Sequence, residues 1–196
     1  MKFHFGELEF DVPVSVYHPA EDSMLLGEAM VKEKLRGKKL LEIGCGSGVL
    51  AIIAAREGAE VTAVDVDKAA VAATIDNAVK ADASIVVKLS DLFEAVGGEK
   101  FDIIVFNPPY LPEDMPQYAD RRWSGGETGR DVIDRFIDSA EKHLAPDGKV
   151  LLLVSSLTKI DKVIERLYKA RFTASVVAKK KVPWEELAVI RAVKLV

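Results

Sequence analysis

Short apolar runs alternate with helix-forming segments through the middle of this chain of 196 residues. The runs KLLEI, VTAVDV, SIVVKL, FDIIVF and KVLLLV stand among segments with helical spacing of apolar residues near 49–56, 68–81 and 130–143. Strands joined through helices run parallel, and strands that are apolar throughout are buried on both faces. We therefore expect an α/β fold in which a doubly wound, mostly parallel sheet is covered by helices on both sides.

The two ends of the chain add antiparallel pieces to this pattern. Apolar and polar residues alternate in the first 16 residues, which predicts a short N-terminal β-hairpin. A helix is expected over residues 19–35, before Gly37. After a last helix near 159–170, the runs FTASVVAKKKV and ELAVIRAVKL leave no room for a helix between them and predict a C-terminal antiparallel hairpin. We expect a seven-stranded sheet in a single domain of residues 1–196, with residues 1–16 as an extension.

Composition excludes several classes of function. A formal net charge of −4 argues against a protein that grips nucleic acid unaided, because phosphate binding relies on a concentrated basic surface. Cys45 is the only cysteine and the three histidines are scattered, so neither an internal disulfide nor a zinc site is expected. No apolar run reaches the roughly 18 residues that a membrane span needs. We expect a cytoplasmic protein without membrane contact or metal.

The segment EIGCGSG, residues 42–48, leaves the first strand of the sheet and leads into a helix. Gly44 and Gly46 let the backbone turn tightly and approach a ligand closely. A dinucleotide fingerprint fits poorly, because Val49 stands where a third glycine or alanine is expected and Glu42 would repel a diphosphate. Glu42 suits a cationic ligand instead. S-adenosylmethionine carries a sulfonium and an ammonium but no phosphate, and its binding proteins use the spacing Glu-x-Gly-x-Gly-x-Gly.

Two aspartates follow the next two strands. Asp65 ends the second strand, where a carboxylate can accept both hydroxyls of a ribose. The alternative is that Asp65 or Asp67 only caps the next helix. Asp91 follows the third strand and could accept from an adenine amino group while Leu92 packs on the ring, or could simply be a turn residue. Together with Glu42, these acids predict a nucleoside-binding rim.

The segment FNPPY, residues 106–110, ends the fourth strand. Asn-Pro often starts a turn, which is the simplest interpretation. However, the strand order 3-2-1-4-5 would place the first and fourth strands side by side, so that Asn107 lies next to Gly44 at the ligand edge of the sheet. The Asn107 side-chain oxygen and the Pro108 carbonyl could then accept both hydrogens of one NH2 group, with Tyr110 as an aromatic wall.

EIGCGSG, SDLF and NPPY, with VYHPAEDS upstream and GGETGRDVIDRF downstream, resemble the HemK-like release-factor glutamine methyltransferases. The likeness is to the archaeal and eukaryotic type, which lacks the N-terminal helical domain of the bacterial branch. It implies a Rossmann-like class I methyltransferase fold. The residues that it implies for the cofactor are Tyr17, Pro19, Ser23, Glu42, Gly44, Gly46, Asp65, Asp91, Leu92 and Asn107, and those for the substrate amide and catalysis are Asn107, Pro108, Pro109 and Tyr110.

The resemblance also implies an activity and a partner. The expected reaction uses S-adenosylmethionine, without a metal, to methylate the side-chain amide of a glutamine in a translation release factor, leaving S-adenosylhomocysteine. A small zinc-binding activator would pair with the apolar edge strand Ser84–Leu89, since edge strands invite strand addition. Two alternatives stay open, a methyltransferase acting on an exocyclic amino group of adenine or guanine, and a non-catalytic module that binds S-adenosylmethionine.

Overall fold

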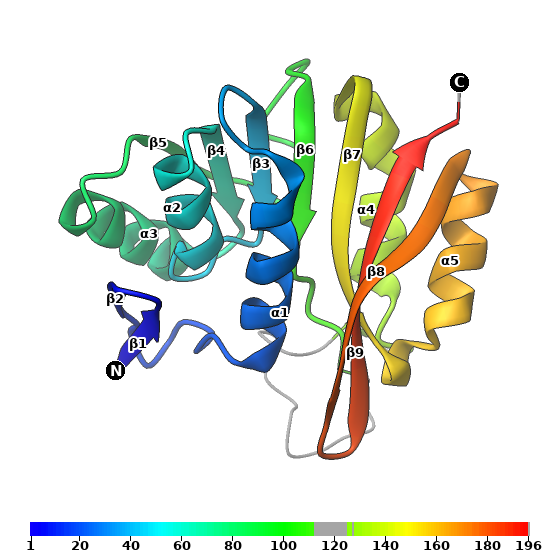
Figure 1. The fold of residues 1–196 in the computed structure, drawn as a ribbon, viewed down its shortest axis with the longest axis horizontal. Coiled ribbons are helices and arrows are strands. Elements are labelled where there is room, and N and C mark those ends of the chain that lie inside the picture. The colour runs from blue at the N-terminus through cyan, green and yellow to red at the C-terminus, as the bar shows by residue number, and fades with distance from the viewer. Residues whose placement is uncertain (112–124, 127, 196) are drawn as a thin grey trace.

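A seven-stranded sheet organises the protein, with the strand order β5-β4-β3-β6-β7-β9-β8 (Figure 1). The computed structural model describes residues 1–111, 125–126 and 128–195. The strands from β5 to β7 are parallel, while β9 runs antiparallel to both β7 and β8. The bounds are β3 Lys39–Ile43, β4 Glu60–Asp65, β5 Ile85–Leu89, β6 Phe101–Phe106, β7 Leu144–Ser155, β8 Phe172–Val182 and β9 Glu185–Lys194. The predicted topology is confirmed.

Helices cover both faces of the sheet because alternate residues of its central strands point to opposite sides. The bounds of the helices are α1 Glu21–Met30, α2 Val49–Arg56, α3 Lys68–Lys80, α4 Asp131–Ala140 and α5 Ile160–Lys169. Ile103 and Val105 of β6 pack in one core cluster with α1 and α2, whereas Ile104 and Phe106 pack in a second cluster with α4 and α5. None of the helices within the described residues is long and apolar enough to cross a membrane.

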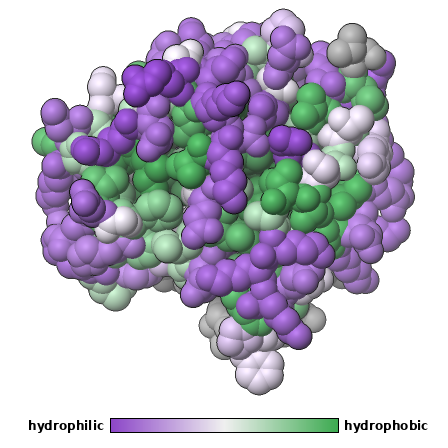
Figure 2. Space-filling model, in the orientation of Figure 1, coloured by the Kyte–Doolittle hydropathy of each residue, from purple (hydrophilic) through white to green (hydrophobic). Residues whose placement is uncertain are grey.

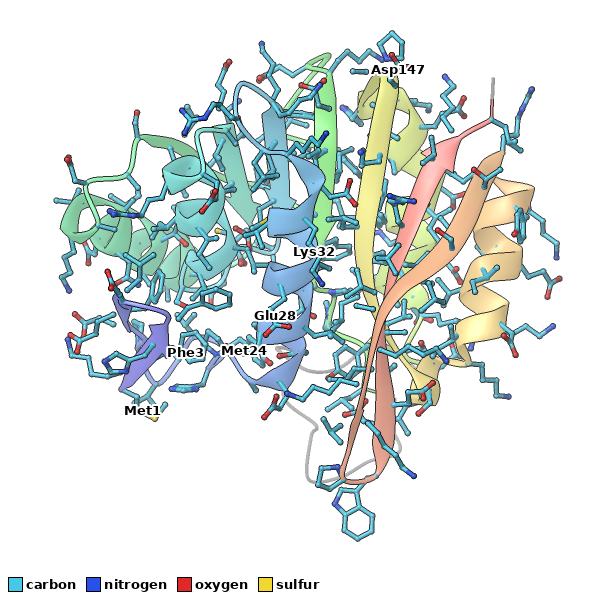
Figure 3. All side chains as sticks on the ribbon, viewed as in Figure 1. Met1, Phe3, Met24, Glu28, Lys32 and Asp147 are labelled. Carbon is cyan, nitrogen blue, oxygen red and sulfur yellow. The ribbon has the colours of Figure 1, made fainter. Side chains whose placement is uncertain are left out.

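Helix α1 is shorter than the prediction that it would run to residue 35. It ends at Met30, a single 3-10 turn covers Val31–Glu33, and Lys34 then adopts a left-handed conformation with φ of 57°. The left-handed residue redirects the chain toward β3, so the turn that was expected at Gly37 begins earlier. Met24 and Glu28 of α1 and Lys32 of the 3-10 turn follow one line on the outer face, at helical spacing (Figure 3).

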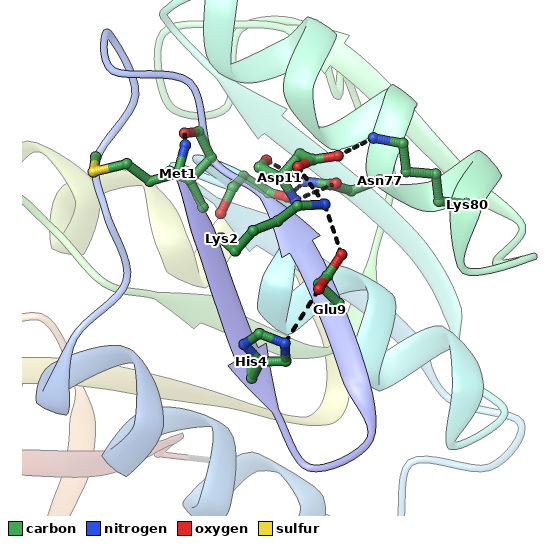
Figure 4. Close-up of polar contacts among 9 residues, drawn as sticks. Met1, Lys2, His4, Glu9, Asp11, Asn77 and Lys80 are labelled. Atoms are coloured by element: carbon green, nitrogen blue, oxygen red, sulfur yellow. Dashed lines mark hydrogen bonds and ion pairs between the residues drawn. The ribbon is translucent and has the colours of Figure 1, made fainter.

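The N-terminal hairpin, β1 Lys2–Phe5 and β2 Leu8–Asp11, forms a separate two-stranded sheet that is fastened to α3 (Figure 4). Asn77 is buried, and its Nδ2 donates to the carbonyls of Asp11 at 2.8 Å and Ser47 at 2.9 Å, while its Oδ1 accepts from the Asp11 N–H. Lys80 forms an ion pair with the Asp11 carboxylate. One side chain of α3 therefore links the hairpin to the glycine loop, residues 44–48, which follows β3.

Polar and charged side chains cover much of the face seen in Figure 2, with apolar residues between them.

Candidate active site

A cavity of about 740 Å³ lies at the carboxyl ends of β3, β4 and β6. Ile43 of β3 pairs with Phe106 of β6, so Gly44 and Asn107 follow at neighbouring positions, as the predicted strand order requires. Every residue that the sequence singled out for the cofactor or the substrate contributes to the lining of this cavity: Tyr17, Pro19, Ser23, Glu42, Gly44, Gly46, Asp65, Asp91, Leu92, Asn107, Pro108, Pro109 and Tyr110. Their individual roles in the cavity stay predictions.

The glycine loop turns with left-handed residues that only glycine adopts readily. Gly44 has a φ of 67° and Gly46 a φ of 56°. A Cβ on Gly46 would meet nothing within 4 Å, so the loop faces open space at this point. Thr74 of α3 supports the loop from behind, because its hydroxyl donates to the Gly46 carbonyl at 3.0 Å. The loop is thus held from the side of α3 and open toward a ligand.

Glu42 is a buried acid at the floor of the cavity. Its Oε2 is buried and has no hydrogen-bond partner among the described residues. Burial raises the pKa of Glu42 well above its usual range, and the charge of Asp65 adds to this effect while the Ala51 N–H opposes it. A positively charged group beside Glu42 would favour the ionised carboxylate. The floor therefore fits the cationic amino-acid part of S-adenosylmethionine.

Asp65 does not cap the helix that follows it. Its Oδ2 accepts from the Gly46 N–H and its Oδ1 from the Asp67 N–H, each at 2.9 Å. Asp67 is the cap of α3, accepting from the Ala69 N–H at 2.8 Å. Burial raises the pKa of Asp65, and the two N–H groups partly oppose this shift. Each carboxylate oxygen can accept more than one hydrogen bond, so Asp65 retains acceptor positions for a ribose.

We expect Asp65→Ala to weaken the affinity for S-adenosylhomocysteine about 10- to 100-fold, because hydrogen bonds to a charged group contribute about 1.5–3 kcal/mol. Isothermal titration calorimetry measures the change. Asp67→Asn is the matched control, because asparagine also caps helices and the affinity should stay the same. An unchanged dissociation constant for Asp65→Ala would show that Asp65 only shapes the glycine loop.

Asp91 and Leu92 lie on the rim of the cavity, just after β5. The Asp91 carboxylate is partly exposed and forms an ion pair with Arg135 of α4 at 2.8 Å. Leu92 has a φ of 48°, and its carbonyl accepts from the Ser90 hydroxyl at 3.0 Å. Asp91 therefore already has a cationic partner, and it retains other acceptor positions for an amino group of the ligand.

Asn107 has a side-chain amide whose orientation is determined by its neighbours. Nδ2 donates to Asp22 Oδ2 at 3.1 Å and lies 3.5 Å from the Ser23 hydroxyl. Because an ionised carboxylate can only accept, this contact places the NH2 group toward Asp22 and leaves Oδ1 on the other side. Asn107 Oδ1 is buried and has no hydrogen-bond partner among the described residues. It is thus an unused acceptor in a side chain that lines the cavity.

Asp22 lines the cavity and was not predicted from the sequence. It is buried, and its carboxylate accepts from the Tyr17 hydroxyl at 2.6 Å, the Ser23 N–H at 2.6 Å and Asn107 Nδ2. Burial raises the pKa of Tyr17 far above its usual range, and the charge and hydrogen bond of Asp22 raise it further. An acid in the first turn of a helix is normally explained by the helix dipole, so its burial was not anticipated.

A second feature that was not predicted is the glycine-rich segment around Gly125 and Gly129, which packs against the backbone at the end of NPPY. The Gly125 N–H donates to the Leu111 carbonyl at 2.9 Å. Gly129 has a φ of 70°, and a Cβ there would lie 2.4 Å from the Tyr110 carbonyl oxygen, which is closer than any real contact. Only glycine permits this approach. In the sequence, GGETG was informative only through the family resemblance, and residues 112–124 and 127 lie outside the described residues.

Comparison with known proteins identifies relatives over most of the chain. The family model described as methyltransferase small domain matches residues 18–182. A candidate protein N5-glutamine methyltransferase of Methanocaldococcus jannaschii is 43% identical over 185 residues, which cover 92% of each chain. The eRF1 methyltransferase catalytic subunit mtq2 of Schizosaccharomyces pombe is 31% identical over 207 residues, covering 92% of this chain and 90% of the relative.

Two solved methyltransferase structures share the fold of this chain. Mtq2 of E. cuniculi, in a complex with Trm112 that methylates the translation termination factor eRF1, matches with a TM-score of 0.77 and 27% identity over 92% of this chain and 99% of that chain. A 16S ribosomal RNA guanine N2 methyltransferase of T. thermophilus, bound to AdoMet and guanosine, also matches with a TM-score of 0.77 and 27% identity, over 99% of this chain and 50% of that chain. The protein thus belongs to the methyltransferase small domain family and, within it, to the HemK-like protein glutamine methyltransferases.

Proposed function

We propose that this enzyme transfers a methyl group from S-adenosylmethionine to the side-chain amide nitrogen of a glutamine in a translation release factor. The observation that carries the proposal is the Asn107 amide, which Asp22 orients so that a buried acceptor oxygen remains unused. Pro108, whose carbonyl is a second acceptor, lines the same cavity. The names of the S. pombe and E. cuniculi relatives support the release factor as the substrate.

An amide nitrogen is a poor nucleophile because its lone pair is delocalised into the carbonyl, so positioning must supply much of the rate. When bound, S-adenosylmethionine supplies a methyl group activated by a positively charged sulfur, so the transfer requires no metal ion. Asn107 Oδ1 and the Pro108 carbonyl would accept the two hydrogens of the substrate NH2 group and aim its nitrogen at the methyl group. Such alignment can supply about 7–11 kcal/mol. The same two oxygens would stabilise the positive charge that develops on nitrogen as the N–C bond forms and the sulfur–methyl bond breaks. S-adenosylhomocysteine is the leaving group, and the surplus proton on nitrogen passes to water.

A second candidate substrate is an exocyclic amino group of a nucleobase. The T. thermophilus neighbour, an RNA guanine methyltransferase, favours it, because a planar NH2 group would meet the same two acceptors. This chain matches only 50% of that neighbour, and its net charge of −4 is unfavourable for holding RNA. The intact pair of Asn107 and Pro108 also argues against a module that only binds the cofactor.

The decisive experiment presents isotopically labelled S-adenosylmethionine to the enzyme together with separate pools of release factor, ribosomal RNA and DNA. We expect label in the release factor, on the amide nitrogen of one glutamine, as peptide mass spectrometry would show. Label in RNA or DNA alone would establish the nucleobase substrate instead. Binding of the cofactor without transfer to any pool would contradict an enzymatic role.

We further propose that a small zinc-binding activator protein pairs with β5. The structure places β5 at the edge of the sheet, starting at Ile85 rather than Ser84. Val86 and Leu89 of this strand are 53% and 46% exposed, and an exposed apolar edge favours addition of another strand. The E. cuniculi relative was solved as a complex with Trm112, which supports a partner of this kind.

We expect Val86→Pro to abolish a one-to-one complex with such a partner, because proline removes an N–H from the strand and fits poorly in a sheet. Co-expression followed by size exclusion with light scattering measures the complex. Val86→Thr is the matched control, since threonine keeps the N–H and favours strands, and its complex should persist. Both variants should still bind S-adenosylhomocysteine. A wild-type chain that is a soluble, fully active monomer, indifferent to the partner, would refute this proposal.

A further inference from the structure

The hairpin of β8 and β9 ends in a two-residue loop with an unusual composition. Val182 pairs with Glu185, so Pro183 and Trp184 form the loop. Trp184 has a φ of 78° and is 95% exposed. Proline followed by a residue with positive φ is the pattern of a type II turn, where glycine or asparagine normally occupies the second position. A tryptophan at this position is a conformational outlier.

No contact within the described part of the chain explains this tryptophan. Its large ring is exposed to solvent rather than packed, and its left-handed backbone is unfavourable for a residue with a side chain. A glycine at position 184 would avoid both costs. Outliers of this kind gather at functional sites, and tryptophan is among the residue types that contribute most to binding at protein interfaces. The loop therefore points to a binding function.

The loop lies at the same edge of the sheet as the active site. β9 runs antiparallel to β7 with Ser155 opposite Leu187, so the first residues of β9 extend beyond the carboxyl end of β7. The cavity lies at the carboxyl ends of the neighbouring parallel strands. In Figure 1 the β8–β9 hairpin projects past the sheet at this end. A protein that presents an amide to Asn107 must approach across this edge.

Contacts close to the loop connect the hairpin to residues near Asn107. The Ser155 hydroxyl donates to the Glu185 carboxylate, and Lys180 of β8 forms an ion pair with Glu21 at the start of α1. Glu21 immediately precedes Asp22, the carboxylate that holds the Asn107 amide. These contacts keep the hairpin at a fixed position relative to the cavity, which is what a docking element requires.

We propose that the hairpin tip, Pro183 and Trp184, docks the protein substrate by packing against an apolar patch beside the glutamine to be methylated. The inference rests on the proposed function. The charge beside the tip is nearly balanced, because Glu185 and Glu186 follow it while Lys179, Lys180 and Lys181 precede it. Lys179 is paired with Glu186 at 2.7 Å and Lys180 with Glu21, so Lys181 alone of these lysines has no ion pair among the described residues. A nucleic acid relies on a concentrated basic surface, so this tip suits a protein better. Pro183 and Trp184 do not line the cavity, so the tip contributes to substrate affinity and not to the chemical step.

The test compares Trp184→Gly with the unaltered enzyme on two substrates, a release factor and a short peptide that carries its glutamine. Glycine suits the turn, so folding and the affinity for S-adenosylhomocysteine should be retained. We expect the KM for the release factor to rise about tenfold or more, as for loss of an interface tryptophan. The kcat for the release factor and the kinetics with the peptide should stay the same. Trp184→Phe should restore part of the affinity.

Tyr168→Ala is the matched control for loss of an exposed aromatic residue. Tyr168 is 52% exposed on α5, and its hydroxyl contacts the Ala174 carbonyl near the opposite end of β8. Its substitution should leave the KM for the release factor unchanged.

An unchanged KM for Trp184→Gly would overturn the proposal. An equal rise in KM for the release factor and the peptide would overturn it too, because it would mean that the tip shapes the cavity. An unchanged KM with loss of self-association on light scattering would assign the tip to a second copy of the chain.

Failure of the proposed function gives a different result. If the unaltered enzyme labels another protein instead of the release factor, the proposed substrate is wrong, and the same comparison of Trp184→Gly with Tyr168→Ala is made on the labelled protein. Label in nucleic acid alone would overturn both the substrate and the docking site.

Discussion

Replacing Asn107 with alanine should lower single-turnover methylation by about 100-fold or more, the size of effect seen when a group that stabilises the transition state is removed. The affinity for S-adenosylhomocysteine should change little, because the carboxylates assigned to the cofactor, Glu42, Asp65 and Asp91, are untouched. Alanine removes the buried Oδ1, the acceptor that we assign to the substrate NH2 group. Single-turnover measurement is required because it isolates methyl transfer from product release.

Asn107→Ala also leaves Asp22 without one of its donors, so a loss of stability must be separated from a loss of positioning. Thermal unfolding measured with saturating S-adenosylhomocysteine makes that separation. Asn77→Ala is a useful comparison, since it removes the asparagine that joins the N-terminal hairpin to the glycine loop. That variant should lower stability more than the chemical rate. A normal single-turnover rate for Asn107→Ala would exclude the proposed role of its amide.

The topology was predictable because it depends on features repeated along the chain. Each buried strand is a continuous apolar run, and the helices between them leave only parallel pairing. Once β3 and β6 are neighbours, Gly44 and Asn107 must meet, because adjacent strands are about 5 Å apart. Asp65, Asp91 and Asn107 were predicted from their positions at the ends of strands, whereas Tyr17, Pro19 and Ser23 were implied only by the family resemblance. The sequence therefore predicted those site residues whose place depends on the order of strands and helices along the chain.

Contacts between distant side chains could not be predicted in this way. Asp22 and Asn107 are 85 positions apart, and no local pattern says that an acid in the first turn of α1 would hold the amide of NPPY. The close approach of Gly129 to Tyr110 also depends on how two loops pack, which a single sequence does not reveal. The predicted end of α1 was wrong for a local reason. The helix stops before a lysine in the left-handed conformation, and lysine, unlike glycine or proline, does not mark the end of a helix in a sequence.

Replacing Asp22 with asparagine should lower turnover by about 10- to 100-fold, corresponding to loss of charged hydrogen bonds worth about 1.5–3 kcal/mol. Three donors now converge on the Asp22 carboxylate, from Tyr17, Ser23 and Asn107. An asparagine has one acceptor oxygen and brings an NH2 group of its own, so it cannot satisfy all three. The Asn107 amide would then lose the contact that determines its orientation, and its NH2 group could face the substrate instead. Glu28→Gln, which removes an exposed charge elsewhere on α1, is the matched control and should leave turnover unchanged.

A double variant separates a positioning role of Asp22 from a general structural one. If Asp22 acts through Asn107, then Asp22→Asn combined with Asn107→Ala should be no slower than Asn107→Ala alone, because the amide that Asp22 orients is already absent. Additive losses would mean that Asp22 contributes separately, for example through Tyr17. Asp22 contacts Tyr17 and Ser23 as well as Asn107, and the double variant distinguishes among these contacts. If the losses in single-turnover rate are not additive, the effect of Asp22 on the rate arises from its contact with Asn107 Nδ2, which lies 3.1 Å from the carboxylate.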